Sequence, residues 1–431
     1  MELISNCRLC RNEQIVNFFD LGNQPPANAL LKNKNAPEKY YPLSLSWCPE
    51  CRLVQLNQTI EPKELFENYM WVTGTSTFAK QFSLKFCNAV LEHCGISDKK
   101  GYILELASND GTFLKTFIDR GHNVLGIDPA QNIVEKAVSN GVPTKCGFFS
   151  KKLAEEVLSD KGFPKVVIAR NILPHVANLH DFVEGIEVCT ENDTLVVIEI
   201  HYAGAILENL HYDSIYHEHL CYFSLSSVEN LLARSNLHVY DIMESYISGG
   251  SIILFIKKGK AEKSSTLQRY INNEIKNKTN ELSSWREFAE KSFFHKVRLL
   301  ELLNNEDKEG HNVVGYGASA RSSTLLNFCG INSRHLSAIA DQNQLKHKFF
   351  TAGTHISINS PENVMKTKPD TVFMLAWNFL DEIANILHER FDFKGRLIIP
   401  LPGPPKTISI KRQVAATKWS CRSGGLTENS S

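Results

Sequence analysis

Short apolar runs and longer amphipathic stretches alternate through the middle of the chain. Runs rich in β-branched and aromatic residues predict buried strands at 102–107, 123–128, 143–148, 165–171 and 194–200. Helical periodicity predicts helices in the gaps, at 130–140, 150–160 and 178–190. This order predicts a parallel sheet covered by helices. Two further strands, at 237–246 and 251–258, flank Ser248-Gly-Gly250 and predict an antiparallel hairpin at the sheet edge.

The first two strands of this region predict a ligand-binding βαβ unit. The first strand contains Glu105 and leads into the turn Ser108-Asn-Asp-Gly111, and Asp128 ends the second strand 23 positions after Glu105. Such a turn lets a ligand approach the backbone, and the second acid is placed to accept hydrogen bonds from a ribose diol. The carboxylates disfavour a pyrophosphate and suit the cationic amino-acid end of S-adenosylmethionine. The alternative is any doubly wound nucleotide-binding fold.

A second α/β region is predicted at 309–404. A strand at 312–316 leads into Gly315-x-Gly317-x-x-Ala320 and a helix, and the next strand ends in Asp341. This turn fits NAD, and a glycine turn opening a helix also fits the diphosphate of a nucleotide sugar. Arg321 and Lys346 add positive charge for a diphosphate. Further strands at 371–377 and 396–402 and a helix at 378–390 complete the pattern.

Apolar residues from Leu267 to Leu303 recur at helical spacing, which predicts a linker of one long or two shorter amphipathic helices at 261–308. Residues 405–431 end in a polar, glycine-containing stretch and are predicted to form a flexible tail.

Two C-x2-C pairs predict a metal site near the start of the chain. Cys7 and Cys10 form one pair, and Cys48 and Cys51 form the other. Four thiolates suffice for a closed tetrahedral Zn²⁺ site, which has no open position for catalysis. The pattern therefore predicts a structural zinc-binding module at 1–65. The alternatives are core thiols or two redox pairs.

Two stretches after predicted strands are unusually polar. Ala169–His175 follows the fourth strand, and Glu199–Phe223 leaves the fifth with four histidines, His201, His211, His217 and His219. One interpretation is a metal site, with His217 and His219 on one strand face. We favour general acid–base chemistry by the imidazoles, with Tyr216 and Glu218 in support. A polar loop that only packs on the sheet is the third possibility.

Composition and charge narrow the class of protein. Lys+Arg and Asp+Glu both number 47 in 431 residues, so no uniform charge favours nucleic acid or an anionic membrane. No apolar run approaches the ~20 residues that cross a bilayer. The first residues do not form a signal peptide, and eleven cysteines without one favour the cytoplasm.

The assembled order resembles the nucleotide-sugar C-methyltransferase family. The resemblance rests on the double C-x2-C module, on Tyr216-His217-Glu218-His219 after the fifth strand, and on Gly315-Tyr-Gly-Ala-Ser-Ala-Arg321 with Ile-Ile-Pro-Leu-Pro at the end. The resemblance covers residues 1 to about 404, nearly the full chain. Two features depart from it: Ala107 stands where many members have Gly, and the tail matches nothing.

The resemblance implies the fold, the ligands and the reaction. It implies a zinc-binding domain, a class I methyltransferase (Rossmann-like) domain at 66–260, and a second Rossmann-like domain at 309–404 that binds the sugar nucleotide without NAD. Family members transfer a methyl group from S-adenosylmethionine to C3 of dTDP-linked 4-keto-deoxysugars. The expected partners are that small molecule and, at most, further copies of the chain in a small oligomer. Alternatives are methylation at oxygen or an NAD-dependent sugar oxidoreductase.

Site residues follow from the motifs and the resemblance together. The chemical argument makes His219 the base that forms an enolate, with Glu218 as its partner and Tyr216 or His175 at the enolate oxygen. The full sets are, for catalysis, Tyr69, His175, Tyr216, Glu218 and His219; for the donor, Glu105, Ala107, Asn109, Asp110, Gly111, Asp128, Pro129 and Asn171; for the sugar nucleotide, Gly315, Tyr316, Gly317, Ala318, Ser319, Arg321 and Lys346; and for zinc, Cys7, Cys10, Cys48 and Cys51.

Overall fold

The computed structural model describes residues 1–66, 72–95, 101–245 and 249–414, and these fall into two compact units. The first unit comprises Met1–Asp20, Leu43–Glu208 and His217–Glu287. The second unit comprises Leu21–Pro42, Asn209–Tyr216 and Phe288–Ser431. Both units are therefore assembled from three separate stretches of the chain.

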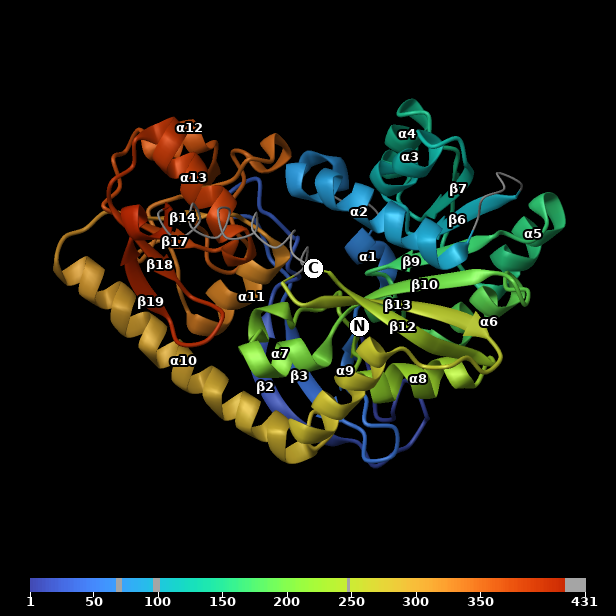
Figure 1. The fold of residues 1–431 in the computed structure, drawn as a ribbon. Coiled ribbons are helices and arrows are strands. Elements are labelled where there is room, and N and C mark those ends of the chain that lie inside the picture. Colours follow the sequence, from blue (N-terminus) through green and yellow to red (C-terminus); the bar gives the residue numbers. More distant parts are fainter. Residues whose placement is uncertain (67–71, 96–100, 246–248, 415–431) are drawn as a thin grey trace, which may run out of the picture. The chain divides into compact units, whose positions relative to one another are not determined.

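A seven-stranded sheet forms the centre of the first unit (Figure 1). In spatial order its strands are β12 (Leu237–Ser245), β13 (Ser251–Lys258), β10 (Leu195–His201), β9 (Val166–Arg170), β6 (Tyr102–Leu106), β7 (Asn123–Asp128) and β8 (Thr144–Cys146). All pairs from β10 to β8 are parallel, whereas β13 is antiparallel to both β10 and β12. The predicted parallel sheet with a hairpin at its edge is confirmed.

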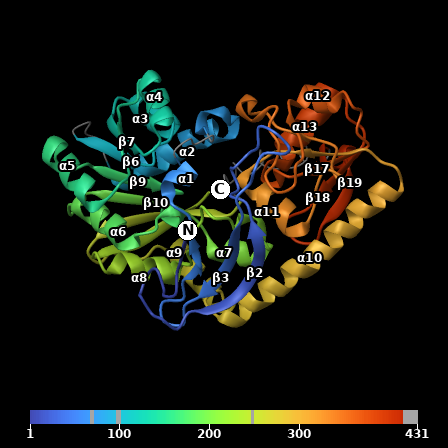
Figure 2. The ribbon, with the colours of Figure 1, turned by 180° about the vertical axis from the view of Figure 1, so that it is seen from behind.

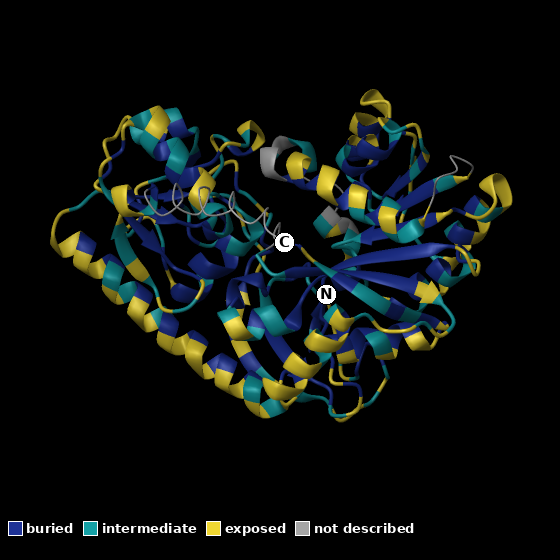
Figure 3. Ribbon diagram, viewed as in Figure 1, coloured by how far each residue is buried: buried dark blue, intermediate teal, exposed yellow. Residues whose placement is uncertain are grey.

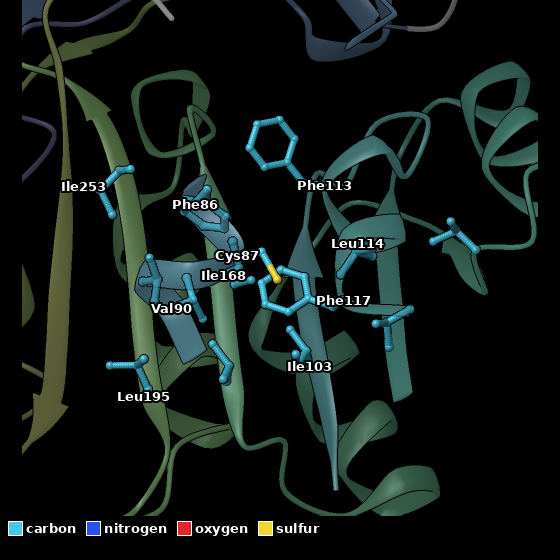
Figure 4. Close-up of a cluster of buried hydrophobic side chains, with 14 of the residues drawn as sticks. Phe86, Cys87, Val90, Ile103, Phe113, Leu114, Phe117, Ile168, Leu195 and Ile253 are labelled. Carbon is cyan, nitrogen blue, oxygen red and sulfur yellow. The ribbon is translucent and has the colours of Figure 1, made fainter. Parts of the chain in front are cut away.

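Helices cover both faces of this sheet. On one face lie α2 (Thr77–Cys94), α3 (Thr112–Ile118) and α4 (Gln131–Ser139), and on the other lie α5 (Lys151–Lys161), α6 (Leu179–Val188) and α8 (Leu225–Ala233). Figure 4 shows the core of the first face, where Phe86 of α2 and Phe117 of α3 point onto Ile103 and Ile168 of the sheet. The central strands β9 and β10 are mostly apolar, as expected for parallel strands that are buried on both faces.

A second sheet of four strands includes the cysteine region. Its order is β11 (Cys221–Tyr222), β4 (Val54–Leu56), β3 (Tyr41–Trp47) and β2 (Val16–Gln24), and Figure 2 shows β2 beside β3 from behind. Its pairs β11–β4 and β4–β3 are antiparallel. A separate pair is formed by β1 (Glu2–Leu3) and β5 (Gln58–Thr59), and α1 (Pro62–Phe66) follows it. The short strand β11 therefore joins residues after His219 to the cysteine region.

The second unit contains a six-stranded sheet. Its order is β16 (Ile358–Asn359), β15 (Ile339–Ala340), β14 (Val313–Tyr316), β17 (Thr371–Met374), β18 (Arg396–Ile399) and β19 (Lys406–Ser409), with α11 (Ala320–Cys329), α12 (Pro361–Met365) and α13 (Leu380–Phe391) between strands. The segment Leu21–Pro42 joins this unit through a β-bridge between Leu31 and Phe350. The carboxylate of Glu38 also accepts hydrogen bonds from the backbone of Gly353 and pairs with His355.

The predicted amphipathic linker consists of α9 (Ser265–Lys276) and α10 (Leu282–Lys308). In Figure 3, buried and exposed positions alternate along α10, as expected for a helix with one packed side. Within the described ranges, no helix is both long and apolar enough to cross a membrane. A further helix, α7 (Ala203–Asn209), follows β10.

The expectation of a flexible tail from residue 405 is wrong for Lys406–Val414. β19 pairs antiparallel with β18 along four residues, and a helical turn then buries Ile410 and Val414. The segment covers an edge of the sheet that would otherwise present unpaired backbone groups. Its sequence is short and only partly apolar, which is why hydrophobic pattern alone did not identify a strand. Residues 415–431 lie outside the described part.

Replacing Ile410 with Ala tests this closing strand. The side chain is 0% exposed in the core of the second unit, so its loss should lower the free energy of unfolding by about 2–5 kcal/mol. Lys411→Ala, at the exposed next position, is the control and should change stability by less than about 0.5 kcal/mol. Denaturant unfolding measures both, and equal midpoints would contradict the burial of this segment.

Candidate functional site

The turn after β6 has an unusual backbone. Ala107 and Asn109 adopt left-handed conformations at φ 55° and 51°, and Gly111 has φ 76°. A left-handed residue other than glycine costs roughly 1–2 kcal/mol, so the surrounding contacts must hold Ala107 in place. At Gly111 a Cβ would lie within 3 Å of the Val142 side chain, so the close packing of α3 requires glycine here. The turn at the carboxyl end of β6 is thus tight, and its residues are buried or half-buried.

Acidic side chains fix the shape of this turn. The carboxylate of Asp128 accepts hydrogen bonds from the backbone N–H groups of Asn109 and Ala130, both at 3.0 Å. Asp110 accepts one from the backbone of Gly74 at 3.0 Å, and the Asn109 side chain accepts one from Thr73 at 2.9 Å. The short 3₁₀ helix η1 (Thr73–Thr75) is therefore part of the turn's surroundings.

A buried charge network lies beneath the turn. Arg170, at the end of β9, donates to Glu199 of β10 at 2.9 Å and lies 3.9 Å from Glu105. Ser245 donates to the other oxygen of Glu199 at 2.6 Å. The guanidinium carbon of Arg170 is 3.2 Å from the ring centroid of Phe113. Two carboxylates thus share one cation, which leaves excess negative charge if both are ionised.

Glu105 is 2% exposed, and its Oε2 atom has no hydrogen-bond partner among the described residues. Burial raises the pKa of Glu105 to about 8; the positive charge of Arg170 opposes this, and the negative charges of Glu199, Asp110 and Asp128 add to it. An orphaned carboxylate oxygen beside further acids fits a positively charged ligand. The residues present therefore suit the sulfonium and ammonium groups of S-adenosylmethionine.

Three histidines gather near the ends of β9 and β10. The rings of His175 and His219 meet edge to face with centroids 4.8 Å apart, and His201 lies 6.3 Å from His219. His175 ends the 3₁₀ helix η2 (Leu173–His175), and burial lowers its pKa to about 4, against a smaller effect of a hydrogen bond with the Glu218 backbone. His175 is therefore neutral at neutral pH, and it donates or accepts hydrogen bonds without carrying charge.

Residues Tyr216–His219 form a turn and not a strand, so the idea of His217 and His219 on one strand face does not apply. Glu218 and His217 are buried, whereas Tyr216 and His219 are half-buried. Among the described residues, the group suited to a metal ion is the four cysteines and not these histidines. Tyr69 lies outside the described residues.

The four cysteines form two turns of the same backbone design. The N–H of Arg11 bonds to the carbonyl of Cys7, the N–H of Arg52 bonds to the carbonyl of Cys48, and both arginines are left-handed at φ 66° and 65°. Sγ atoms of Cys7 and Cys51 are 3.4 Å apart, as are those of Cys10 and Cys48, and all four lie within 4.8 Å of one another. Zn–S bonds of 2.3 Å in a tetrahedron give S···S separations of about 3.8 Å, so the four thiols fit Zn²⁺.

In the second unit, the turn after β14 makes internal contacts. Gly317 has φ 96°, and a Cβ there would lie 2.4 Å from that of Ala376. Asp341 accepts the backbone N–H groups of Ala318 and Asn343, both at 2.8 Å. Lys346 is 7% exposed, donates to the Ala318 carbonyl at 2.6 Å and lies 3.5 Å from Asp341. The positive charge of its ammonium group is therefore already balanced by the Asp341 carboxylate within the turn.

Arg321 is engaged in the same way. Its guanidinium donates twice to Asp213, at 2.7 and 3.1 Å, and stacks over the Trp377 ring at 4.5 Å. Trp377 also donates to Asp213 at 2.8 Å. Arg321 thus anchors the segment Asn209–Tyr216 within the second unit. Whether it also binds a diphosphate stays a prediction.

Sequence reasoning missed several residues of these sites. Arg170 and Glu199 lie within the two polar stretches but were not assigned, although their charge inside apolar strands was a usable signal. Thr73 and Asp213 carry no such signal, because their partners are 36 and 108 or more positions away. His201 was visible in the stretch, and only the fold shows that it reaches His219.

The sheet order and the acidic turn define a class I methyltransferase domain, and three family models match consecutive parts of the chain. A zinc binding domain matches 7–66, a methyltransferase domain matches 78–242, and a C-methyltransferase C-terminal domain matches 246–402. C-methyltransferase NovU of Streptomyces niveus is 31% identical over 405 residues, covering 93% of this chain and 96% of that protein. The chain belongs to the C-methyltransferase family, and it is an S-adenosylmethionine-dependent enzyme.

Solved methyltransferases also align with this chain. One from Clostridium acetobutylicum shares 12% identity at a TM-score of 0.34 and covers 43% of this chain and 94% of its own. The CcbJ methyltransferase of Streptomyces caelestis shares 12% identity at a TM-score of 0.33, and the alignment covers 41% of this chain and 90% of CcbJ.

Zinc content tests the cysteine site. The purified protein should contain one zinc ion per chain, and Cys48→Ser should lower both the zinc content and the unfolding midpoint. Cys146→Ser, which removes an exposed cysteine outside the cluster, is the control and should retain the metal. Elemental analysis measures the content. Equal zinc loss in both variants would contradict the assignment.

The pH dependence of stability tests Glu105. The pKa of its carboxyl group is ordinarily near 4.5, and burial raises it to about 8. Between these pH values the folded state therefore holds a proton that the unfolded chain releases. This contribution is complete below pH 4.5 and is lost as the pH rises through about 8. Without ligand, the unfolding midpoint should therefore decrease as the pH rises from 6 to 9, and Glu105→Gln should reduce that decrease. Glu155→Gln, at an exposed position on α5, should leave it unchanged.

Proposed function

We propose that this C-methyltransferase methylates a nucleotide-linked 4-keto-deoxysugar at the carbon beside the ketone, through an enolate. The observation that supports it most directly is the close pair of His219 and neutral His175 beside the ends of β9 and β10. Ligands of doubly wound folds bind at this edge of the sheet. One half-buried imidazole next to a second, uncharged one fits a base beside a hydrogen-bond donor.

The reaction needs an acidified carbon, because a saturated sugar carbon is not nucleophilic. In the proposed first step, His219 takes the proton from C3, and the electron pair of the C–H bond forms the enolate with the neighbouring ketone. Burial keeps His175 uncharged, so it stabilises the enolate oxygen as a hydrogen-bond donor and not as a cation. Tyr216 is the alternative donor, and Glu218 orients His219.

In the second step the enolate carbon bonds to the methyl group that S-adenosylmethionine supplies. The methyl–sulfur bond breaks, and its electron pair stays on sulfur in S-adenosylhomocysteine. The turn residues Glu105, Asn109, Asp110 and Asp128, with Asn171 after β9, are proposed to bind the donor. Holding both reactants at one edge removes much of the entropic barrier to this step. Zinc has no part in the chemistry and serves the fold of the cysteine module.

The remaining site residues stay proposals as well. The turn Gly315–Ser319 of the second unit is proposed to bind the nucleotide, and Tyr69 to line the sugar. We also retain, as a proposal, the division into a zinc module (1–65), a methyltransferase domain (66–260), a helical linker (261–308) and a nucleotide-sugar domain (309–404). The cytoplasm is the proposed location, with a monomer or small homo-oligomer as the active form.

Proton exchange separates the base from the rest of the site. In D₂O without donor, the wild-type enzyme should exchange the C3 proton of a dTDP-linked 4-keto-deoxysugar, as followed by NMR. His219→Ala should reduce exchange and methylation at least ~100-fold, the usual contribution of a general base, while donor affinity stays within twofold by calorimetry. His238→Ala, on β12, is the control and should behave like wild type. Normal turnover in His219→Ala would refute the base assignment.

A further inference from the structure

The cysteine module makes direct hydrogen bonds to the segment that carries His219. β4 begins three residues after Cys51. It lies between β3 and β11 and pairs with β11 through Gln55–Cys221 and Val54–Tyr222. The backbone N–H of Leu56 donates to the carbonyl of Leu220 at 2.9 Å. Leu220 is the residue directly after His219.

The peptide of Leu220 also connects to the second histidine. Its N–H donates to the carbonyl of Pro174 at 2.7 Å, and Pro174 directly precedes His175. Both backbone groups of Leu220 are therefore used, one toward β4 and one toward the loop of His175. This pair of bonds therefore connects β4 with the backbone next to both imidazoles, whose ring centroids lie 4.8 Å apart.

Both cysteine turns are fixed to the same strand. The side chain of Gln55 accepts a hydrogen bond from the N–H of Arg8 at 2.7 Å and donates one to the carbonyl of Asn6 at 3.0 Å. These two bonds flank Cys7. The second turn is bonded to the residue directly before β4, since the N–H of Cys48 donates to the carbonyl of Leu53 at 2.9 Å. Gln55 is 0% exposed, so breaking its bonds leaves unsatisfied polar groups in the interior.

Arg8 strengthens the same connection. Its guanidinium, 4% exposed, donates to the carbonyls of Leu56 and Gln58 and to the hydroxyl of Thr59, at 2.9–3.4 Å. Hydrogen bonds from a charged donor are roughly twice as strong as neutral ones. Arg8, which directly follows Cys7, thus holds the far end of β4 while Gln55 holds its middle.

We infer that Gln55 and Arg8 are positioning residues, through which the zinc-bound cysteine turns and β4 hold His219 at the correct distance from His175. The inference rests on the proposed role of His219 as base. The metal fixes the two turns, the turns fix β4, and β4 fixes Leu220. Loss of this support displaces the base by a fraction of an ångström to an ångström, which costs rate without affecting the donor site.

The test compares two buried glutamines of the same module. Gln55→Ala removes the bonds that flank Cys7, whereas Gln58→Ala removes a buried amide whose side chain donates to Ser44 at 2.8 Å. We expect Gln55→Ala to slow C3 proton exchange in D₂O at least ~10-fold. Donor affinity by calorimetry should stay within twofold, and zinc content should stay at one per chain. Hydrogen exchange of the 217–222 peptide should rise in Gln55→Ala and not in Gln58→Ala.

The outcomes separate this inference from the proposed function. Absence of both exchange and methylation in wild type refutes the proposed function. Normal wild-type exchange with equal rates in Gln55→Ala and Gln58→Ala refutes the positioning role alone. Should Gln55→Ala fail to fold, zinc is removed from wild type with a chelator. Intact donor binding with lost proton exchange then supports the inference, and retained exchange, or loss of donor binding as well, overturns it.

Discussion

Parallel strands end at one edge of their sheet, and this constraint determines where the charged side chains of the first unit gather. β6, β7, β9 and β10 are parallel neighbours, so Glu105, Asp128, Arg170 and Glu199 all reach the same edge although they are spread over about a quarter of the chain. Helices on both faces remove water from the strands, which makes each of these charges costly to bury. The sheet therefore concentrates charge where only a complementary ligand or a paired side chain relieves it.

The distribution of charge at this edge distinguishes two kinds of acid. The carboxylate of Asp128 accepts hydrogen bonds from backbone N–H groups and holds the turn together, whereas the Oε2 atom of Glu105 has no hydrogen-bond partner within the described part of the chain. Arg170 compensates part of the negative charge, and its contact with Phe113 keeps the guanidinium in an apolar setting. A cationic methyl donor at this edge would balance the negative charge that Glu105 carries once its carboxyl group is ionised.

Sequence alone predicted the features that depend on local pattern. The strands with continuous apolar runs, the turn after Glu105 and the two C-x2-C turns were all read correctly, because each is specified by neighbouring residues. Pairings across long separations were not accessible: Arg321 looked like a diphosphate ligand, and only the fold reveals Asp213 as its partner. β19 was missed because a four-residue edge strand has too few apolar positions to show a period. The donor residues were expected from the turn after Glu105 and from Asp128 at the end of the next strand, and the catalytic residues from the family resemblance and the chemical argument.

The interleaving of the two units has a consequence for how such an enzyme diversifies. The second unit takes Leu21–Pro42 from between the cysteine pairs and Asn209–Tyr216 from beside the histidines, besides its main stretch from Phe288 onward. A gene fragment encoding only that main stretch would lack Asp213 and Glu38, which pair with Arg321 and His355 inside the same unit. Exchange of that main stretch alone by a single recombination event would therefore remove the partners that this chain supplies to the Arg321 guanidinium and the His355 imidazole. Transfer of an intact second unit therefore requires three coordinated replacements, one for each stretch.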